Sequence, residues 1–134
     1  LLYFNTRKDI KLNLIKPEND IYFHFDTLQI SRCFNNLIKN AIEAVEKIPN
    51  PAVEVLMATD AKNIKIEIKD NGVGIDEKML SKIFEPYFTT KTKGTGLGLS
   101  IVKRIIEDHG GKIKIEKNKN MAGTKSLINF EYNA

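Results

Sequence analysis

The sequence predicts an α+β fold, a two-layer α/β sandwich in which a mixed sheet of about five strands carries three helices on one face. Two observations predict it. Segments with strand-like alternation come in pairs, and segments with a helical apolar period separate those pairs, in the order β-β-α-β-β-α-loop-α-β-β. With 134 residues, 42% of them hydrophobic, the chain is long enough to bury the core of one domain, residues 1–134.

The strands are predicted from apolar residues at every second position, which places them on one face of a sheet. The middle pair is a hairpin, because the turn-forming run Asp60-Ala61-Lys62-Asn63 separates two such segments. The predicted strands lie, in chain order, at residues 8–16, 21–25, 53–57, 64–68, 113–115 and 127–130.

Three segments carry the apolar spacing of amphipathic helices. The first begins at a cap, Asp26 or Thr27, and runs to about Ile48, where two prolines end it. A short second helix is predicted over Asp76–Phe84, and a third over Leu97–His109, which Gly110-Gly111 ends. Residues 85–96 are rich in Pro, Thr, Lys and Gly and lack an apolar period, so they predict a mobile loop.

Glycines are concentrated beside the third helix, in the run Gly94-Thr95-Gly96-Leu97-Gly98-Leu99-Ser100, and again in Asp70-Asn71-Gly72-Val73-Gly74-Ile75. Alternating glycines remove Cβ atoms where a helix begins, so backbone N–H groups can approach an anion that the helix dipole also favours. The pattern predicts a site for phosphate groups. The spacing is neither that of a P-loop nor the Gly-x-Gly-x-x-Gly of dinucleotide folds.

Asn36 and Asn40 lie four residues apart and share one face of the first helix. Amide oxygens are ligands suited to Mg²⁺, and amide nitrogens can donate to phosphate. The simpler interpretation is two tolerated surface residues. Asn is a poor helix former, however, and two at this spacing beside the apolar stripe favour a site.

Asp70 ends a predicted strand directly before Gly72 and Gly74. Its carboxylate could accept a hydrogen bond from the exocyclic amine of a purine, and the glycines would let the backbone approach the ring. A plain Asp-Asn-Gly turn is the alternative, and the glycines downstream disfavour it. Lys91 and Lys93 flank the later glycines as positive charges for a terminal phosphate, and for Lys93 a solvated lysine is an equal alternative.

Other classes of function are disfavoured. The net charge is +4, but the lysines are scattered, so nucleic-acid binding is not expected. Two histidines and a single cysteine cannot form a His/Cys metal cluster, and Cys33 fits a reducing compartment. No apolar run approaches the ~20 residues of a membrane span, so direct membrane contact by this domain is not expected.

Together these motifs resemble the catalytic, ATP-binding domain of bacterial sensor histidine kinases, of the GHKL superfamily with the Bergerat fold. The resemblance covers nearly the whole chain, with the motifs in the order of that family. Asn36–Ala44 is similar to its N box, Asp70–Ile75 to the G1 box, Phe84–Phe88 to the F box, Gly94–Leu99 to the G2 box and Ala122-Gly123-Thr124 to the last glycine motif. The residues of the N and F boxes are similar to those of the nitrogen-regulation type of sensor kinase.

The resemblance implies ATP and Mg²⁺ as cofactors and a mobile ATP lid over residues 85–96. Asn40 would ligate Mg²⁺ beside Asn36, Asp70 would bind the adenine amino group, and Lys91 would reach the γ-phosphate. Asn36, Asn40 and Lys91 are thus the expected catalytic residues. The residues expected to bind ATP are Asn36, Asn40, Asp70, Gly72, Gly74, Ile75, Phe88, Thr90, Lys91, Gly94, Thr95, Gly96, Leu97, Gly98, Leu99 and Thr124.

The implied activity is transfer of the γ-phosphoryl group to a histidine in two-component signalling. The ATP-hydrolysing branches of the superfamily carry Glu where this chain has Asn36, and Asn cannot act as a general base. A GHKL ATPase is therefore the second hypothesis, and a non-catalytic nucleotide-binding module is the third. No acceptor motif resembling His-Glu-Leu-Arg-Asn-Pro is present, so the chain is expected to be a piece of a longer protein.

Two partners follow from this resemblance: the dimerisation and phosphoacceptor domain of the parent protein, and a cognate response regulator. The domain itself is expected in the cytoplasm, while a longer parent protein could be anchored in a membrane.

Overall fold

The computed structural model describes residues 11–15, 25–60, 62–86, 88, 98–118 and 122–131, with residues 11–15 described as backbone. The elements are β1 (Lys11–Ile15), α1 (Thr27–Ala44), β2 (Ala52–Thr59), β3 (Asn63–Asp70), α2 (Glu77–Leu80), α3 (Gly98–Asp108), β4 (Gly111–Lys117) and β5 (Thr124–Glu131). Residues 21–24 of the expected second strand lie outside this description, as does most of the expected lid.

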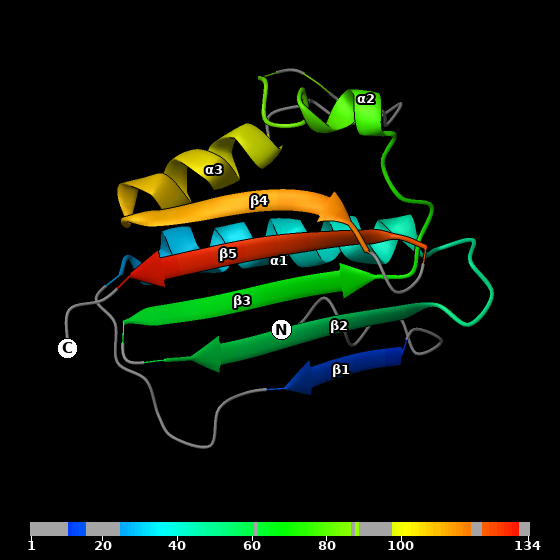
Figure 1. Ribbon diagram of the computed structural model, residues 1–134, viewed down its shortest axis with the longest axis horizontal. Coiled ribbons are helices and arrows are strands. Elements are labelled where there is room, and N and C mark those ends of the chain that lie inside the picture. The colour runs from blue at the N-terminus through cyan, green and yellow to red at the C-terminus, as the bar shows by residue number, and fades with distance from the viewer. Residues whose placement is uncertain are drawn as a thin grey trace.

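The described strands form a five-stranded sheet in the order β1-β2-β3-β5-β4 (Figure 1). β1 runs parallel to β2, and the other neighbours are antiparallel, so the mixed sheet predicted from the sequence is confirmed. β2 and β3 form the expected hairpin. The Oδ1 atom of Asp60 accepts from the N–H groups of Lys62 and Asn63, at 2.9 and 2.8 Å, and so closes the turn.

α1 and α3 pack against one face of the sheet and against each other, and the core lies between the two layers (Figure 1). Apolar side chains at every second position of a strand form the sheet's side of the core, as β3 shows with Ile64, Ile66 and Ile68. Thr27–Ala44 buries one stripe of apolar residues, and Gly98–Asp108 does the same with Val102, Ile105 and Ile106. The predicted sandwich with helices on one face is therefore confirmed.

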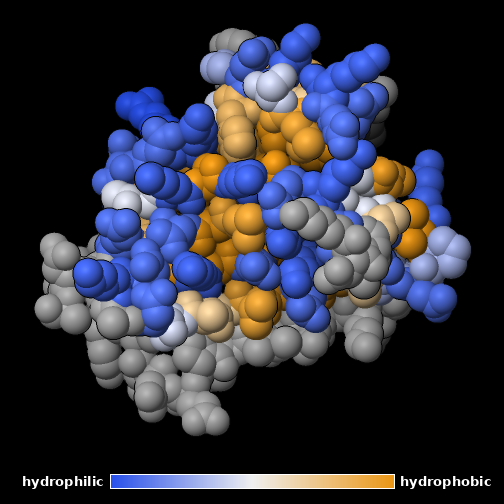
Figure 2. All heavy atoms as spheres, viewed as in Figure 1, coloured by the Kyte–Doolittle hydropathy of each residue, from blue (hydrophilic) through white to orange (hydrophobic). Residues whose placement is uncertain are grey.

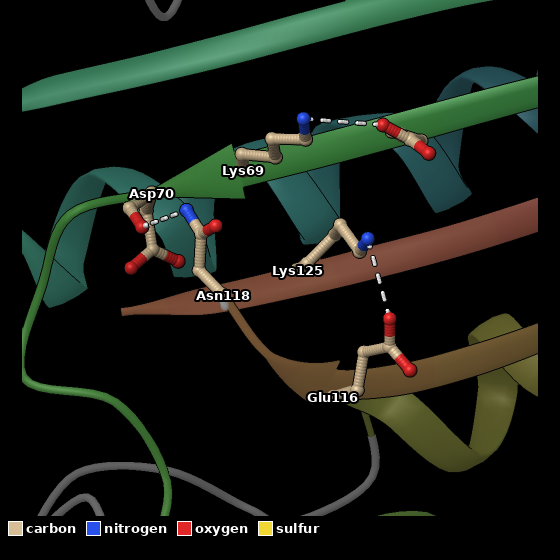
Figure 3. Close-up of polar contacts among 6 residues, drawn as sticks. Lys69, Asp70, Glu116, Asn118 and Lys125 are labelled. Carbon is tan, nitrogen blue, oxygen red and sulfur yellow. Dashed lines mark hydrogen bonds and ion pairs between the residues drawn. The ribbon is translucent and has the colours of Figure 1, made fainter. Parts of the chain in front are cut away.

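Charged and polar side chains cover much of the other face of the sheet, with hydrophobic side chains visible between them (Figure 2). Lys69 on β3 is opposite Lys125 on β5, and each lysine contacts a carboxylate. The Nζ atom of Lys69 is 3.4 Å from Glu67, and that of Lys125 is 3.3 Å from Glu116 (Figure 3). On β3 the alternation of isoleucines with polar and charged residues thus separates a core face from a solvent face.

α1 begins as predicted and ends earlier than predicted. The Oδ1 atom of Asp26 accepts from the N–H of Gln29 at 3.1 Å, which is an N-cap. The helix ends at Ala44, although the sequence predicted about Ile48. After Ala44 the N–H groups of Val45 and Glu46 donate three residues back, at 3.2 and 3.4 Å, which is a tighter turn than an α-helix. The carbonyl of Ala44 accepts from the N–H of Val73, in the loop after β3, at 3.3 Å.

α2 is also shorter than the predicted helix over Asp76–Phe84. Asp76, predicted as the first helical residue, is instead the N-cap, since its Oδ1 atom accepts from the N–H of Lys78 at 3.0 Å. After Leu80 the chain forms tight turns, in which the N–H of Glu85 donates to the carbonyl of Lys82 at 2.9 Å. α2 has no buried residue, so the layer over the sheet is formed by α1 and α3.

His109 joins the end of α3 to the beginning of α1. Its Nε2 atom accepts from the N–H of Asp26 at 3.0 Å, and its Nδ1 atom is 2.7 Å from the carbonyl oxygen of Ile105. Because a backbone N–H points at Nε2, the proton of the neutral ring is on Nδ1 and is donated to Ile105. His109 thus bonds the last turn of α3 and the N-cap residue of α1. Among the described helices, none is long and apolar enough to cross a membrane.

Candidate functional site

Asp70 is the centre of the site, at the end of β3. The residue is 6% exposed, which is rare for a carboxylate. Its Oδ1 atom accepts from two backbone N–H groups, that of Gly72 at 2.9 Å and that of Thr124 at 3.2 Å. The loop after β3 and the beginning of β5 therefore hold the carboxylate in one orientation. Both hydrogen bonds end on Oδ1, so Oδ2 keeps its capacity to accept from a ligand.

Burial raises the pKa of the Asp70 carboxyl above its ordinary value, and the hydrogen bonds from Gly72 and Thr124 oppose this shift. Burial is the larger effect, so the carboxylate is a stronger proton and hydrogen-bond acceptor than an exposed aspartate. Such a group suits the recognition of an N–H donor in a partly desolvated site.

Two glycines beside Asp70 lie so close to neighbouring backbone that neither position has room for a side chain. A Cβ atom on Gly72 would lie 2.8 Å from the Cβ of Ala44 and closer still to its carbonyl. A Cβ atom on Gly123 would lie 2.8 Å from the carbonyl carbon of Asp70, and Gly123 also has a φ of +120°. The first glycine lets the loop after β3 pack on the end of α1, and the second lets the beginning of β5 pack on Asp70.

The other predicted glycines differ from these two. Gly74 has a φ of +77°, a left-handed conformation that suits glycine, and the nearest atom to an added Cβ is 3.7 Å away. Gly98 is the first residue of α3, and an added Cβ there would meet nothing within 4 Å. Space around Gly98 therefore allows a side chain in the structure without ligand.

Asn36 and Asn40 lie on α1 and are half-buried beside the buried Leu37 and Ala41. Asn40 precedes Ala44 by one helical turn, and Ala44 contacts the loop after β3 through the N–H of Val73. This contact fixes the end of α1 relative to Asp70. The structure thus places the asparagine face and the Asp70 loop on elements that are packed together.

The remaining predicted residues divide into two groups. Ile75, Phe88 and Leu99 are half-buried, and Leu99 also packs against the core, so it has a structural role whatever it binds. The other predicted site residues lie outside the described part of the chain: Thr90, Lys91, Gly94, Thr95, Gly96 and Leu97, together with the neighbouring Lys93.

Two residues of the site were missed by the sequence analysis. The Oδ1 atom of Asn71 accepts from the N–H of Ala52 at 2.9 Å, and its Nδ2 atom donates to the carbonyl of Asn50 at 2.9 Å. Asn118, 8% exposed, donates from Nδ2 to the main-chain carbonyl of Asp70 at 3.4 Å (Figure 3). Both asparagines occur in segments typical of turns, so local sequence gave no signal for these distant contacts.

Comparison with known proteins assigns the family. The profile of the family described as histidine kinase-, DNA gyrase B- and HSP90-like ATPases matches residues 25–133, which is most of the chain. The chain belongs to this family. Membership implies that the domain uses ATP, and it confirms the resemblance found in the sequence motifs.

Individual relatives are sensor kinases. Sporulation kinase A of Bacillus subtilis is 40% identical over 113 residues, which are 84% of this chain and 18% of that protein. The nitrogen regulation protein NtrY of Azorhizobium caulinodans is 40% identical over 96 residues, which are 68% of this chain and 12% of that protein. The chain thus spans a fifth or less of these relatives, and one of them is of the expected nitrogen-regulation type.

A solved structure supports the same assignment. The catalytic domain of the histidine kinase ThkA, in a nucleotide-free form, superimposes with a TM-score of 0.85 at 33% identity. The match covers 97% of this chain and 86% of that one. The fold is therefore that of a histidine kinase catalytic domain, as the sequence motifs predicted.

The raised pKa of Asp70 predicts a pH dependence of ATP binding. The sequence motifs predict that Asp70 accepts from the adenine amine. On that prediction, we expect affinity for ATP to fall as the pH falls through the raised pKa, because a protonated carboxyl is a poorer acceptor. The stability of the free domain should change in the opposite direction, since a group with a raised folded-state pKa favours the folded state increasingly as it becomes protonated. Calorimetric titration with ATP and urea unfolding, each carried from neutral pH down to the ordinary aspartate pKa of about 3.9, measure the two effects.

A folded Asp70→Asn variant is the control for both measurements, because it has no carboxyl at this position. An ATP affinity that falls with pH equally in this variant and in the wild type would contradict the assignment of the pH dependence to Asp70.

Proposed function

We propose that the chain binds Mg-ATP and transfers the γ-phosphoryl group to a histidine on a separate dimerisation domain, in two-component signalling. The observation that carries the proposal is the buried carboxylate of Asp70, oriented by the N–H groups of Gly72 and Thr124. A single buried acceptor of this kind selects adenine, which has an exocyclic amine as donor, over guanine, which presents a carbonyl at the same position. Family membership and the kinase relatives support the proposed use of ATP for phosphoryl transfer.

The proposed Mg²⁺ would be held chiefly by the phosphates and by Asn40, beside Asn36. Within the described residues, no group of three or more His, Cys, Asp or Glu side chains is arranged for a metal ion. A site with few protein carboxylates fits Mg²⁺ bound together with ATP, because the phosphate oxygens supply the negative charge. The half-buried amides of α1 offer neutral oxygen ligands of the right type. When bound, the ion neutralises charge on the transferring group.

Transfer, and not hydrolysis, is proposed because Asn36 occupies the position where a general base would activate water. An amide has no proton-accepting capacity at neutral pH, so the chain's own residues bind and orient ATP without activating water. Catalysis then consists of positioning the γ-phosphate in line with a histidine nitrogen and of charge stabilisation. Lys91 is the proposed cation for the γ-phosphate. The glycine run Gly94–Gly98 is proposed to supply backbone N–H groups.

The proposed partners are the dimerisation and phosphoacceptor domain of the parent protein and, through it, a response regulator. We propose that the domain lies in the cytoplasm, because ATP and a response regulator are found there. The parent protein could still carry a membrane anchor elsewhere.

The test is phosphotransfer in trans. We expect the chain with Mg²⁺ and γ-labelled ATP to remain unlabelled, and to label the dimerisation domain of its parent protein when that domain is added. An acceptor domain with its histidine replaced by alanine is the control and should stay unlabelled. Rapid hydrolysis of ATP by the chain alone, with no label on the acceptor, would show that the GHKL ATPase hypothesis is the correct one.

A further inference from the structure

The main-chain carbonyl of Asp70 lies at a junction of three segments. Asp70 is the last residue of β3, and the neighbouring strand β5 begins at Thr124. The side chain of Asn118, directly after β4, approaches this carbonyl and donates to it from Nδ2 at 3.4 Å (Figure 3). Asn118 therefore supplies a hydrogen-bond donor to a buried carbonyl at the end of β3.

The same asparagine is itself fixed by the turn that carries Gly123. The N–H of Asn118 donates to the carbonyl of Gly123 at 3.1 Å, and Gly123 packs directly on the Asp70 carbonyl. The next residue, Thr124, donates its N–H to the Asp70 carboxylate. The turn between β4 and β5 thus contacts Asp70 at two points: the Asn118 amide at its main chain and Thr124 at its side chain.

We propose that Asn118 is a positioning residue for nucleobase recognition. By holding the main chain of Asp70 against the turn, it sets the direction of the Oδ2 atom that accepts from the adenine amine. The inference rests on the proposed adenine site at Asp70 and adds a residue that no motif of the sequence singled out. Asn118 acts through Asp70 and needs no contact of its own with the nucleotide.

Loss of the Asn118 amide leaves the Asp70 carbonyl buried without this donor, and the end of β3 can then relax toward another partner. The hydrogen bond between Asp70 and the adenine amine depends on the angle at the carboxylate, so it weakens. The contacts proposed for the phosphates come from other parts of the chain and do not depend on this angle. The specific consequence is a loss of discrimination for the amine, and not a uniform loss of affinity.

The experiment compares ATP with purine riboside triphosphate, which differs from ATP only in lacking the 6-amino group. The dissociation constant for purine riboside triphosphate divided by that for ATP measures how much the amine contributes to binding. We expect Asn118→Ala to reduce this ratio by about five-fold to ten-fold, the size of one misaligned hydrogen bond, while affinity for purine riboside triphosphate stays near that of the wild type. Asn118→Leu removes the donor while keeping the branching and the number of heavy atoms of the side chain, and it should have the same effect if the alanine variant does not fold.

Two further variants separate the possible failures. Ser126→Ala changes a buried polar residue of β5, 9% exposed, and should leave the ratio unchanged. Asp70→Asn should reduce the ratio, and if it does not, the proposed adenine site itself is wrong. The positioning role of Asn118 is overturned if Asp70→Asn reduces the ratio but neither folded Asn118 variant does. It is also overturned if the Asn118 variants weaken the binding of both nucleotides equally.

Discussion

Replacing Asp70 by Asn should weaken ATP binding by about a hundred-fold or more while leaving the fold intact. The amide of Asn has one oxygen where the carboxylate has two. If that oxygen accepts from the N–H groups of Gly72 and Thr124, the amide nitrogen takes the place of Oδ2 and presents donors to the adenine amine. If the amide is turned around, its nitrogen faces two backbone donors. Either orientation leaves buried donors facing each other.

Calorimetric titration with ATP and with GTP measures this prediction, and Asp60→Asn provides a matched control. Asp60 also accepts, through Oδ1, from the N–H two residues later, at 2.9 Å, but it is exposed and closes the turn of the β2–β3 hairpin. Its replacement should leave affinity for ATP unchanged. A folded Asp70→Asn variant that binds ATP as tightly as the wild type would remove Asp70 from the nucleotide site.

The parts of the fold that the sequence predicted correctly depend on local patterns. Alternating apolar residues predicted β2 and β3, and the cap at Asp26 predicted where α1 begins. In each case the signal lies within a few residues of the feature, as with the turn that Asp60 closes. The position of Asp70 at the end of a strand followed from the same kind of pattern.

The parts that were missed depend on contacts between distant segments. After Ala44 the N–H groups of Val45 and Glu46 donate to carbonyls three residues back, and the carbonyl of Ala44 accepts from the distant Val73, a contact that residues 44–48 alone do not indicate. Asn118 contacts Asp70 across a separation of 48 residues. A turn asparagine bonded to water would have the same sequence signature. The motifs therefore pointed to Asp70, Gly72 and Thr124, which the structure joins by hydrogen bonds, but not to the asparagine that contacts the Asp70 main chain.

Gly123→Ala should be the most destabilising of the glycine substitutions in the described part of the chain. An alanine there meets two separate penalties. Its Cβ would overlap the carbonyl group of Asp70, which is backbone and cannot rotate away, and its φ would have to remain near +120°, where L-residues are strained. We expect a loss of about 3 kcal/mol or more in the free energy of unfolding, together with weaker ATP binding, because relief of the overlap moves Thr124 away from the Asp70 carboxylate.

Gly98→Ala is the matched comparison, since both glycines belong to motifs that the sequence linked to ATP. No atom lies within 4 Å of an added Cβ at Gly98, which is the first residue of α3. Alanine favours helix over glycine by up to about 1 kcal/mol, so this variant should be as stable as the wild type or slightly more stable. Urea unfolding of both variants checks the prediction. An unfolding free energy of Gly123→Ala within about 0.5 kcal/mol of the wild type would show that the beginning of β5 can shift without cost, and the rigid junction around Asp70 would then be wrong.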